Sequence, residues 1–437
     1  MIEIKPVGGY SEVGRNCVLV KYKEETVMLD FGLEMENYIR LSEDESVPRK
    51  IPKAMLMREG AIPDINPVKD DLKKLKAVCV SHAHLDHVGG LPYLLDDYSV
   101  PVHATEFTIK VLENILDDKG VSHKDLHSHP SNSRFKISDN LEIEFIHVTH
   151  STPQTVIIVV HTPEGSVLYA NDFRLDDTPM LGKPPNYAAM ENVENPRALI
   201  MDSLYSLKDV SNKSETFANE ELKKILLQGE TKNKNIVVTT FASHVERIKM
   251  LIDIADELGR TPVFLGRSLH KYLSAAKAAG IEDFSKYTFV KSGRKTKTYF
   301  ENMKKTKDKL FIATGHQGEP KAILSRMTKE NIFPFEKDDI VVFSCKIIPI
   351  EQSYKNREVL EEKLEKKGVQ IFTDVHVSGH AARKDHKRMI ELIKPEHIVP
   401  THGTVAMLES QKDLAVSLGY DPKKVHLLTN YSSIYLK

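Results

Sequence analysis

Residues 81–90 of the chain read SHAHLDHVGG, which places three histidines and one aspartate within six positions. This density of ligand-type side chains in one short segment is typical of a metal site. His82 and His84 are two residues apart, so in an extended segment both imidazoles point to the same side and can bind one cation. Asp86 and His87 are adjacent and project differently, so they serve a second cation more easily. The segment therefore predicts a site for two metal ions.

Several apolar segments downstream also end in a histidine or an aspartate. LEIEFIHVTH alternates as a strand does and ends at His150, SVLYAND ends at Asp172, and RALIMDS ends at Asp202. Loops at strand ends are where a rigid sheet presents ligands. Two ions need a carboxylate that bridges them, and Asp172 is the natural candidate, with His150 completing the first ion's ligands. Two divalent ions about 3.5–4 Å apart would clamp a displacement at phosphorus or at an acyl carbon, and a bridging water would lose a proton near neutral pH.

The pattern of predicted elements changes near residue 206. Before it, NCVLVKY with TVMLDF and TVIIVVHT with SVLYAND are predicted to be strand pairs joined by tight turns. After it, the strands NIVVTTF, TPVFLG, KLFIATG and DIVVFSC alternate with long amphipathic helical patterns, which predicts a parallel sheet.

Two further segments stand out by composition. The segment 40–67 is rich in proline and charge and is predicted to be a long loop. The segment 286–309 has nine Lys or Arg against two acids, which indicates either a solvated face or a contact for a polyanion backbone.

Composition excludes some classes of protein. The formal net charge is −1, so global charge does not indicate a nucleic-acid partner. No window approaches 18 consecutive apolar residues, and MIEIKPVGGY lacks the pattern of a secretory signal, so we expect no membrane association. The three cysteines are far apart and fit a reducing cytoplasm. The HSH at 127–129 has no Asp-His pair after it and is predicted to lie on the surface.

Together, SHAHLDHVGGLPYLL, HVTHS and ANDF resemble the metal motifs of the metallo-β-lactamase fold. MDSLYS, HVSGHA and VPTHG resemble three further motifs of its β-CASP branch, whose members act on nucleic acids. VGGYSEVGRNCVLV, GAIPDI, TTFASHVERI and ATGHQGEP resemble the ribonuclease J family, although His316 stands where family members often have serine. The resemblance runs across nearly the whole chain to residue 437, as expected of the shorter, archaeal type.

The resemblance implies an α/β fold, a metallo-β-lactamase αββα sandwich with an inserted β-CASP α/β domain. The expected boundaries are 1–205 for the first part of the metallo-β-lactamase domain, 206–370 for the β-CASP domain, and 371–437 for the return segment.

The resemblance also implies roles for individual residues. One zinc would be held by His82, His84 and His150, the other by Asp86, His87 and His402, with Asp172 bridging them. Mn²⁺ or Mg²⁺ are the alternative ions. Asp30 and Asp202 would support the ligands, and Asp30 also fits a strand-end turn. RNA phosphates would contact Ser243, Arg267, Ser378, Gly379 and His380. Asp86, Asp172 and His380 would be the catalytic residues, with His380 protonating the leaving oxygen.

The implied activity is metal-dependent hydrolysis of RNA in decay and maturation, 5′→3′ from 5′-monophosphate ends, by a homodimer. Endonucleolytic cutting is a second activity that the resemblance allows. Three alternatives stay open: a CPSF-like endonuclease of the same branch, a hydrolase of small thioesters or lactones on the same metal core, and a relative that only binds RNA. The small-molecule hydrolase would not need the insert, and a binding-only relative would not need every ligand position filled.

Overall fold

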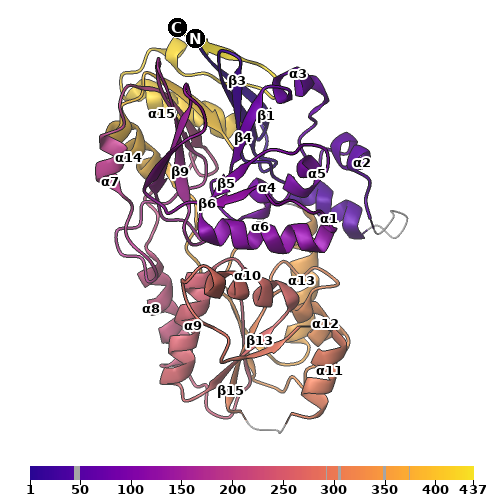
Figure 1. Ribbon diagram of the computed structural model, residues 1–437. Helices are drawn as coiled ribbons and strands as arrows, with labels where there is room; N and C mark the ends of the chain where they lie inside the picture. Colours follow the sequence, from indigo (N-terminus) through magenta and orange to yellow (C-terminus); the bar gives the residue numbers. More distant parts are fainter. Residues whose placement is uncertain (44–49, 292, 304–306, 348–350, 374) are drawn as a thin grey trace. The chain divides into compact units, whose positions relative to one another are not determined.

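The computed structural model describes residues 1–43, 50–291, 293–303, 307–347, 351–373 and 375–437. They form two compact units (Figure 1). The first unit contains Met1–Asp177, Lys183–Asn212 and Gly379–Lys437, and the second contains Thr178–Gly182 and Lys213–Ser378. The chain therefore passes between the units four times.

The first unit contains two sheets. One has the strand order β19-β1-β2-β3-β4-β5-β6 and the other β18-β11-β10-β9-β8-β7. The strands of the first sheet are β1 (Ile2–Gly8), β2 (Cys17–Tyr22), β3 (Glu25–Leu29), β4 (Leu75–Cys79), β5 (Val102–Ala104), β6 (Leu126–Ser128) and β19 (Ile434–Leu436). Those of the second are β7 (Ser133–Lys136), β8 (Glu142–His147), β9 (Val156–Thr162), β10 (Gly165–Ala170), β11 (Pro196–Asp202) and β18 (His397–Thr401).

The two sheets pack face to face around a shared apolar core. Val18 and Val20 of β2 belong to the same buried cluster as Phe145 of β8 and Ile158 of β9. Successive strand residues point to opposite faces, so the alternate residues, such as Leu19, pack outward against helices. Strands of this kind are buried on both faces, which explains why they read as nearly continuous apolar runs.

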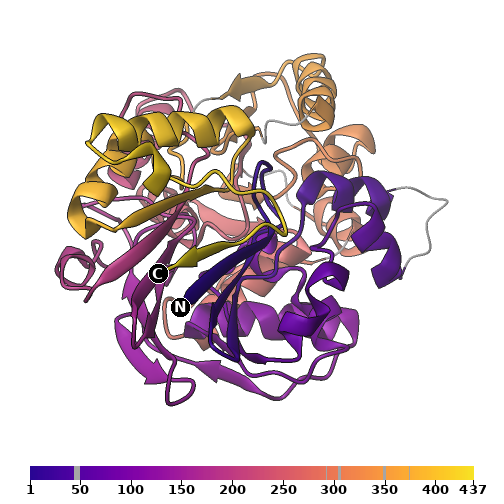
Figure 2. The same cartoon turned by 90° about the horizontal axis from the view of Figure 1, so that it is seen from above.

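Helices cover both outer faces of the sandwich. On the first sheet lie α3 (Lys69–Leu72), α5 (Leu91–Leu95) and α6 (Glu106–Lys119). On the second lie α7 (Tyr187–Glu191), α14 (Arg383–Ile393) and α15 (Val405–Ser417), and the last two are the gold and yellow helices in Figure 2. The layers are therefore helix, sheet, sheet, helix, which confirms the predicted αββα sandwich.

The ends of the chain meet in the first sheet. β1 pairs antiparallel with β19, with Ile2 opposite Leu436, and both views show the termini side by side (Figures 1 and 2). The return segment also supplies β18, which pairs in parallel with β11.

The second unit contains one sheet with the order β14-β13-β15-β12-β16-β17, in which every pairing is parallel. Its strands are β12 (Ile236–Thr239), β13 (Thr261–Leu265), β14 (Thr288–Val290), β15 (Lys309–Ala313), β16 (Ile340–Phe343) and β17 (Gln370–Phe372). Its helices are α8 (Glu215–Leu226), α9 (Val245–Glu257), α10 (Arg267–Ala278), α11 (Gly293–Glu301), α12 (Ile323–Lys329) and α13 (Glu351–Glu365). The predicted parallel sheet is thus confirmed, with α8 and α9 to one side and α11 and α12 to the other (Figure 1).

The prediction of a loop for the whole of 40–67 is wrong. The end of α1 (Met35–Glu43), α2 (Lys53–Arg58) and a 3₁₀ turn (Asn66–Val68) lie in it, while residues 44–49 fall outside the described residues. Leu56 of α2 is buried in a small apolar cluster with Leu33, Leu41 and Ile62. The residues KAMLMR are good helix formers, and Pro52 precedes them at the N-cap, where no helical N–H is needed.

Two other sequence predictions need adjustment. The strand predicted to end at His150 is β8, which ends at His147, so His150 lies in the following loop. In the HSH segment His127 is exposed as predicted, but His129 is half-buried and stacks on Phe135, with ring centroids 3.6 Å apart. No helix in the described ranges is long and apolar enough to cross a membrane.

Candidate metal centre

Three histidines and one aspartate meet at the end of β4 in the first unit. His82 and His84 follow this strand in extended backbone, His150 lies in the loop after β8, and Asp172 follows β10. Nδ1 of His84 is 3.2 Å from Nε2 of His82 and 3.0 Å from Nε2 of His150. Both of these Nε2 atoms are 3.4 Å from Oδ2 of Asp172. These separations suit tetrahedral coordination, because a Zn–N bond of about 2.0–2.1 Å puts neighbouring ligand atoms about 3.3 Å apart.

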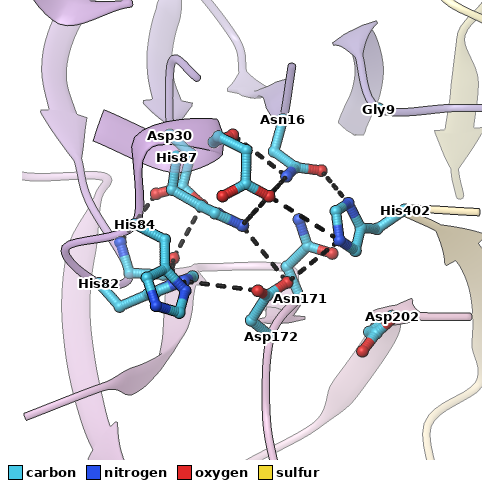
Figure 3. A network of polar contacts seen from close by, with 12 residues as sticks. Gly9, Asn16, Asp30, His82, His84, His87, Asn171, Asp172, Asp202 and His402 are labelled. Carbon is cyan, nitrogen blue, oxygen red and sulfur yellow. Dashed lines mark hydrogen bonds and ion pairs between the residues drawn. The ribbon is translucent and has the colours of Figure 1, made fainter. Parts of the chain in front are cut away.

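A second group of ligands shares Asp172. Asp86 and His87 lie on α4 (Leu85–Val88), and Nε2 of His87 is 3.4 Å from Oδ2 of Asp86 and 3.3 Å from Oδ1 of Asp172. His402, directly after β18, has its Nε2 3.7 Å from Oδ1 of Asp172 and 3.9 Å from Oδ2 of Asp86. Figure 3 shows His82, His87 and His402 around Asp172.

Asp172 is the shared residue of the two groups. Its side chain is almost fully buried, and neither carboxylate oxygen has a hydrogen-bond partner among the described residues. A buried carboxylate without donors is strongly disfavoured unless a cation compensates it. Each oxygen instead faces imidazole nitrogens of a different group, so the residues present fit a pair of cations bridged by Asp172.

Asp30 orients His87 from behind. Its Oδ2 accepts hydrogen bonds from Nδ1 of His87 at 2.7 Å and from Oγ of Ser81 at 2.8 Å, and its Oδ1 accepts one from the backbone N–H of Ser81. Asp30 is fully buried and has a φ of 59°, a left-handed conformation that non-glycine residues seldom adopt. This strained backbone places Asp30 where it fixes Nδ1–H on His87 and turns Nε2 toward Asp86 and Asp172, where a cation would bind.

Backbone and hydroxyl acceptors fix the other imidazoles in the same way. The Ser81 hydroxyl donates to Asp30, so it accepts from Nδ1 of His82 at 3.0 Å. The carbonyl of Gly379 accepts from Nδ1 of His150 at 2.7 Å. A Cβ at position 379 would lie 2.7 Å from Oγ of Ser151 and 2.9 Å from Cε1 of His150, so only glycine fits there. Besides its predicted phosphate contact, Gly379 therefore positions a ligand histidine.

Asn16 is a site residue that the sequence reasoning missed. Its Nδ2 is 3.0 Å from Nε2 of His87 and 3.1 Å from the carbonyl of Asp86, and its Oδ1 is 3.0 Å from Nδ1 of His402 (Figure 3). It thus joins ligands that are far apart in the sequence. The sequence feature that could have identified Asn16 is its place in VGRNCVLV, directly before β2. One amide side chain does not by itself indicate a metal site.

His380 and Asp202 form a pair beside Asp172. Nδ1 of His380 is 3.0 Å from Oδ2 of Asp202, at the end of β11, and its Nε2 is 3.8 Å from Oδ2 of Asp172. Asp172, His380 and His402 also form a third set of potential metal ligands. Burial opposes a charge on His380, but the carboxylates of Asp172 and Asp202 outweigh it and raise its pKa to about 9.

The electrostatics differ between the two groups of ligands. Burial and the neighbouring His82 lower the pKa of His84 to about 3, and burial likewise lowers that of His150, so these imidazoles are neutral, the form that binds a metal. Burial also opposes a charge on His87, yet Asp172, Asp86 and Asp30 together raise its pKa well above the usual value. A metal cation would take the place of this proton among the carboxylates.

Three predicted phosphate contacts belong to the second unit. Ser243 follows β12, Arg267 begins α10 after β13, and Ser378 ends the unit. The residues after β12 and β13 lie at the carboxyl edge of the parallel sheet, where ligands of such folds bind. His316 follows β15 at the same edge and is buried.

Comparisons with known proteins first define the class. Residues 10–225 match the metallo-beta-lactamase superfamily, residues 233–361 match "Ribonuclease J, beta-CASP domain", and residues 366–428 match "Zn-dependent metallo-hydrolase RNA specificity domain". With the metal-ligand geometry above, these matches define a β-CASP metallo-hydrolase. A crystal structure of a protein of unknown function from Enterococcus faecalis V583 has a similar fold, with a TM-score of 0.67 at 16% identity over 99% of both chains.

Full-length relatives then define the family. The chain is 38% identical to ribonuclease J of Methanocaldococcus jannaschii over 98% of this chain and 97% of the relative. It is 36% identical to ribonuclease J of Pyrococcus abyssi over 96% and 94%. Ribonuclease J 1 of Streptococcus pyogenes is 27% identical over 97% of this chain and 72% of its own length. The chain belongs to the ribonuclease J family.

Proposed function

We propose that the protein is a zinc-dependent ribonuclease that removes nucleotides from RNA in the 5′→3′ direction, preferring 5′-monophosphate ends, in RNA decay and maturation. The observation that carries the proposal is Asp172, a buried carboxylate with one oxygen facing each group of imidazoles. The ribonuclease J relatives, which align over nearly their whole length, support RNA as the substrate.

We assign two zinc ions per chain, with Mn²⁺ or Mg²⁺ as alternatives. His82, His84 and His150 would hold the first, Asp86, His87 and His402 the second, and Asp172 would bridge them; the distances above support both sets. When bound, the two ions would supply a nucleophile at neutral pH and neutralise charge on the phosphate.

The chain's own residues would then position the substrate and move the proton. In the metal-free protein Asp172 and Asp202 raise the pKa of His380 to about 9, and Asp202, which is not among the assigned ligands, would still favour the protonated form with the ions bound. With Nδ1 directed at Asp202, its Nε2 would donate to the leaving oxygen. Ser378 and Gly379 would contact the scissile phosphate beside it, while Ser243 and Arg267 would bind the 5′-phosphate.

The organisation of the chain is part of the proposal. We assign 1–205 and 371–437 to the metallo-β-lactamase domain and 206–370 to the β-CASP domain, supported by the division into two compact units near these positions. We also propose that two copies pair through the β-CASP domain. Three free, buried cysteines support a reducing, cytoplasmic location.

The test uses one body-labelled RNA with a 5′-monophosphate, a 5′-triphosphate or a 5′-hydroxyl, incubated with the zinc-loaded protein. Mononucleotides accumulating from the monophosphate form alone, without internal fragments, are expected. Discrete internal fragments that do not depend on the 5′ end would favour a CPSF-like endonuclease instead. Asp86→Ala should abolish cleavage while RNA binding survives, and activity after complete chelation would refute the metal mechanism.

A further inference from the structure

A second cluster of metal-ligand side chains lies in the second unit. It consists of Glu215 at the start of α8, His244 at the N-cap of α9, and Glu246 in the first turn of α9. One ligand atom from each lies within 4.8 Å of the others, and all three side chains are buried. Nε2 of His244 is 3.3 Å from Oε1 of Glu215. His244 and Glu246 lie in the TTFASHVERI stretch, but the proposed reaction gives no role to Glu215, His244 or Glu246.

Each carboxylate of this cluster is held by donors on one side. Oε2 of Glu215 accepts from Nε of Arg247 at 3.0 Å and from Nη2 at 2.6 Å. Oε1 of Glu246 accepts from the backbone N–H groups of Met180 and Leu181, the latter at 3.1 Å. Carboxylates that bind metals are characteristically oriented by such outer hydrogen bonds. The cluster is therefore preorganised rather than a chance meeting of acidic side chains.

Arg247 connects the cluster to the segment that ends the second unit. Its guanidinium pairs with Glu215 and bonds in addition to Oγ of Ser344 and to the carbonyl of Val375. His376 follows Val375, and its Nδ1 is buried without a hydrogen-bond partner in the described part of the chain. His376 thus places an imidazole nitrogen that has no partner among the described residues near Arg247 and His244.

We propose that Glu215, His244 and Glu246 bind one divalent transition-metal ion, of the Zn²⁺ or Mn²⁺ type, separate from the centre at Asp172. One imidazole with two carboxylates is a ligand set that suits such ions. The ion ties α8 to α9 and, through Glu246, to the segment Thr178–Gly182. This segment begins six residues after Asp172, so the ion also anchors the chain that follows the loop of Asp172.

The experiment counts metal in the full-length protein by elemental analysis after dialysis against zinc or manganese. The wild type is expected to hold one equivalent more than the Asp172 centre accounts for. His244→Ala and Glu246→Gln should each lose one equivalent, whereas the control His270→Ala, in the same unit but outside the cluster, should lose none. Equal metal content in all four proteins would overturn the proposal.

A second measurement does not depend on folding of the cluster variants. In the double variant His84→Ala/Asp172→Ala, which disrupts the catalytic centre, zinc or manganese titrated by calorimetry should still bind at one equivalent and raise the melting temperature. Absence of this remaining equivalent would refute the second site even if the ribonuclease assignment holds. If the double variant holds the remaining equivalent but the zinc-loaded wild type fails in the RNA assay, only the proposed function is refuted.

Discussion

Replacing Asp30 with asparagine tests how the ligands of the metal centre are oriented. Asp30 accepts hydrogen bonds with both oxygens, from His87 and Ser81. An amide of the same shape has one oxygen and one NH₂ group, so one of these donors must face another donor. If the NH₂ faces Nδ1 of His87, it favours the tautomer with the proton on Nε2. Nε2 then has no lone pair for a cation held between Asp172 and Asp86.

The expected magnitude follows from this geometry. Losing such a partner of a metal-binding histidine typically costs 10–100-fold in metal affinity or activity, or about 1.4–2.8 kcal/mol. We expect this range for Asp30→Asn, because the bond to His87 is short and fully buried. The substitution should not add backbone strain, since asparagine also tolerates the positive φ of this position.

The assay measures zinc affinity by competition with a chromogenic chelator, and RNA turnover at saturating zinc. Asp71→Asn is the matched control, because Asp71 is also a buried carboxylate of the first unit but pairs with Lys5 and Lys21 instead of a ligand. Wild-type zinc affinity and turnover in Asp30→Asn would refute the role assigned to Asp30.

Three further predictions concern single residues or short segments. Lys21 and Lys5 overcome burial and lower the pKa of Asp71, so its contribution to stability is present above about pH 4 and is lost as the pH falls through the folded-state pKa. Asp71→Asn should therefore melt below the wild type at pH 7, with the gap closing toward pH 3; a gap constant with pH would contradict this. His380→Ala should lose at least 100-fold in turnover, as expected for a general acid, yet retain its zinc, and a loss of half the zinc would make His380 a ligand. Of the basic segment 286–309, residues 292 and 304–306 lie outside the described residues; replacing Lys291, Lys295 and Lys297 with alanine should flatten the salt dependence of RNA binding, whereas an unchanged slope would indicate a solvated face.

The sequence predicted the strands and the parallel sheet because their signals are local, whereas the sandwich was implied by the resemblance to the metallo-β-lactamase fold. Alternating or continuous apolar runs report strands, and the ligands cluster in HxHxDH or follow a strand closely, as Asp172 does. The assignment of His82, His84, Asp86, His87, His150, Asp172 and His402 as ligands stays a prediction, although the structure brings them within a few ångströms of Asp172.

The rest could not be read from the sequence because it depends on contacts between distant segments. Asn16 matters only because it lies between α4 and the loop after β18. The strained φ of Asp30 and the carbonyl of Gly379 are backbone features that a residue type does not report. The helix α2 was missed because proline and charge outweighed a short apolar pattern, whose value lies in the buried Leu56.

The placement of β18 after residue 396 has a consequence for synthesis of the protein. On the ribosome, the strands that carry His82, His150 and Asp172 emerge long before His380 and His402, and the second unit is completed in between. Under the proposed roles of His380 and His402, a partly synthesised chain thus lacks its proton donor and one metal ligand, as well as the strand that pairs with β11. In the proposed mechanism, cleavage activity therefore arises only after the last segment of the chain has docked.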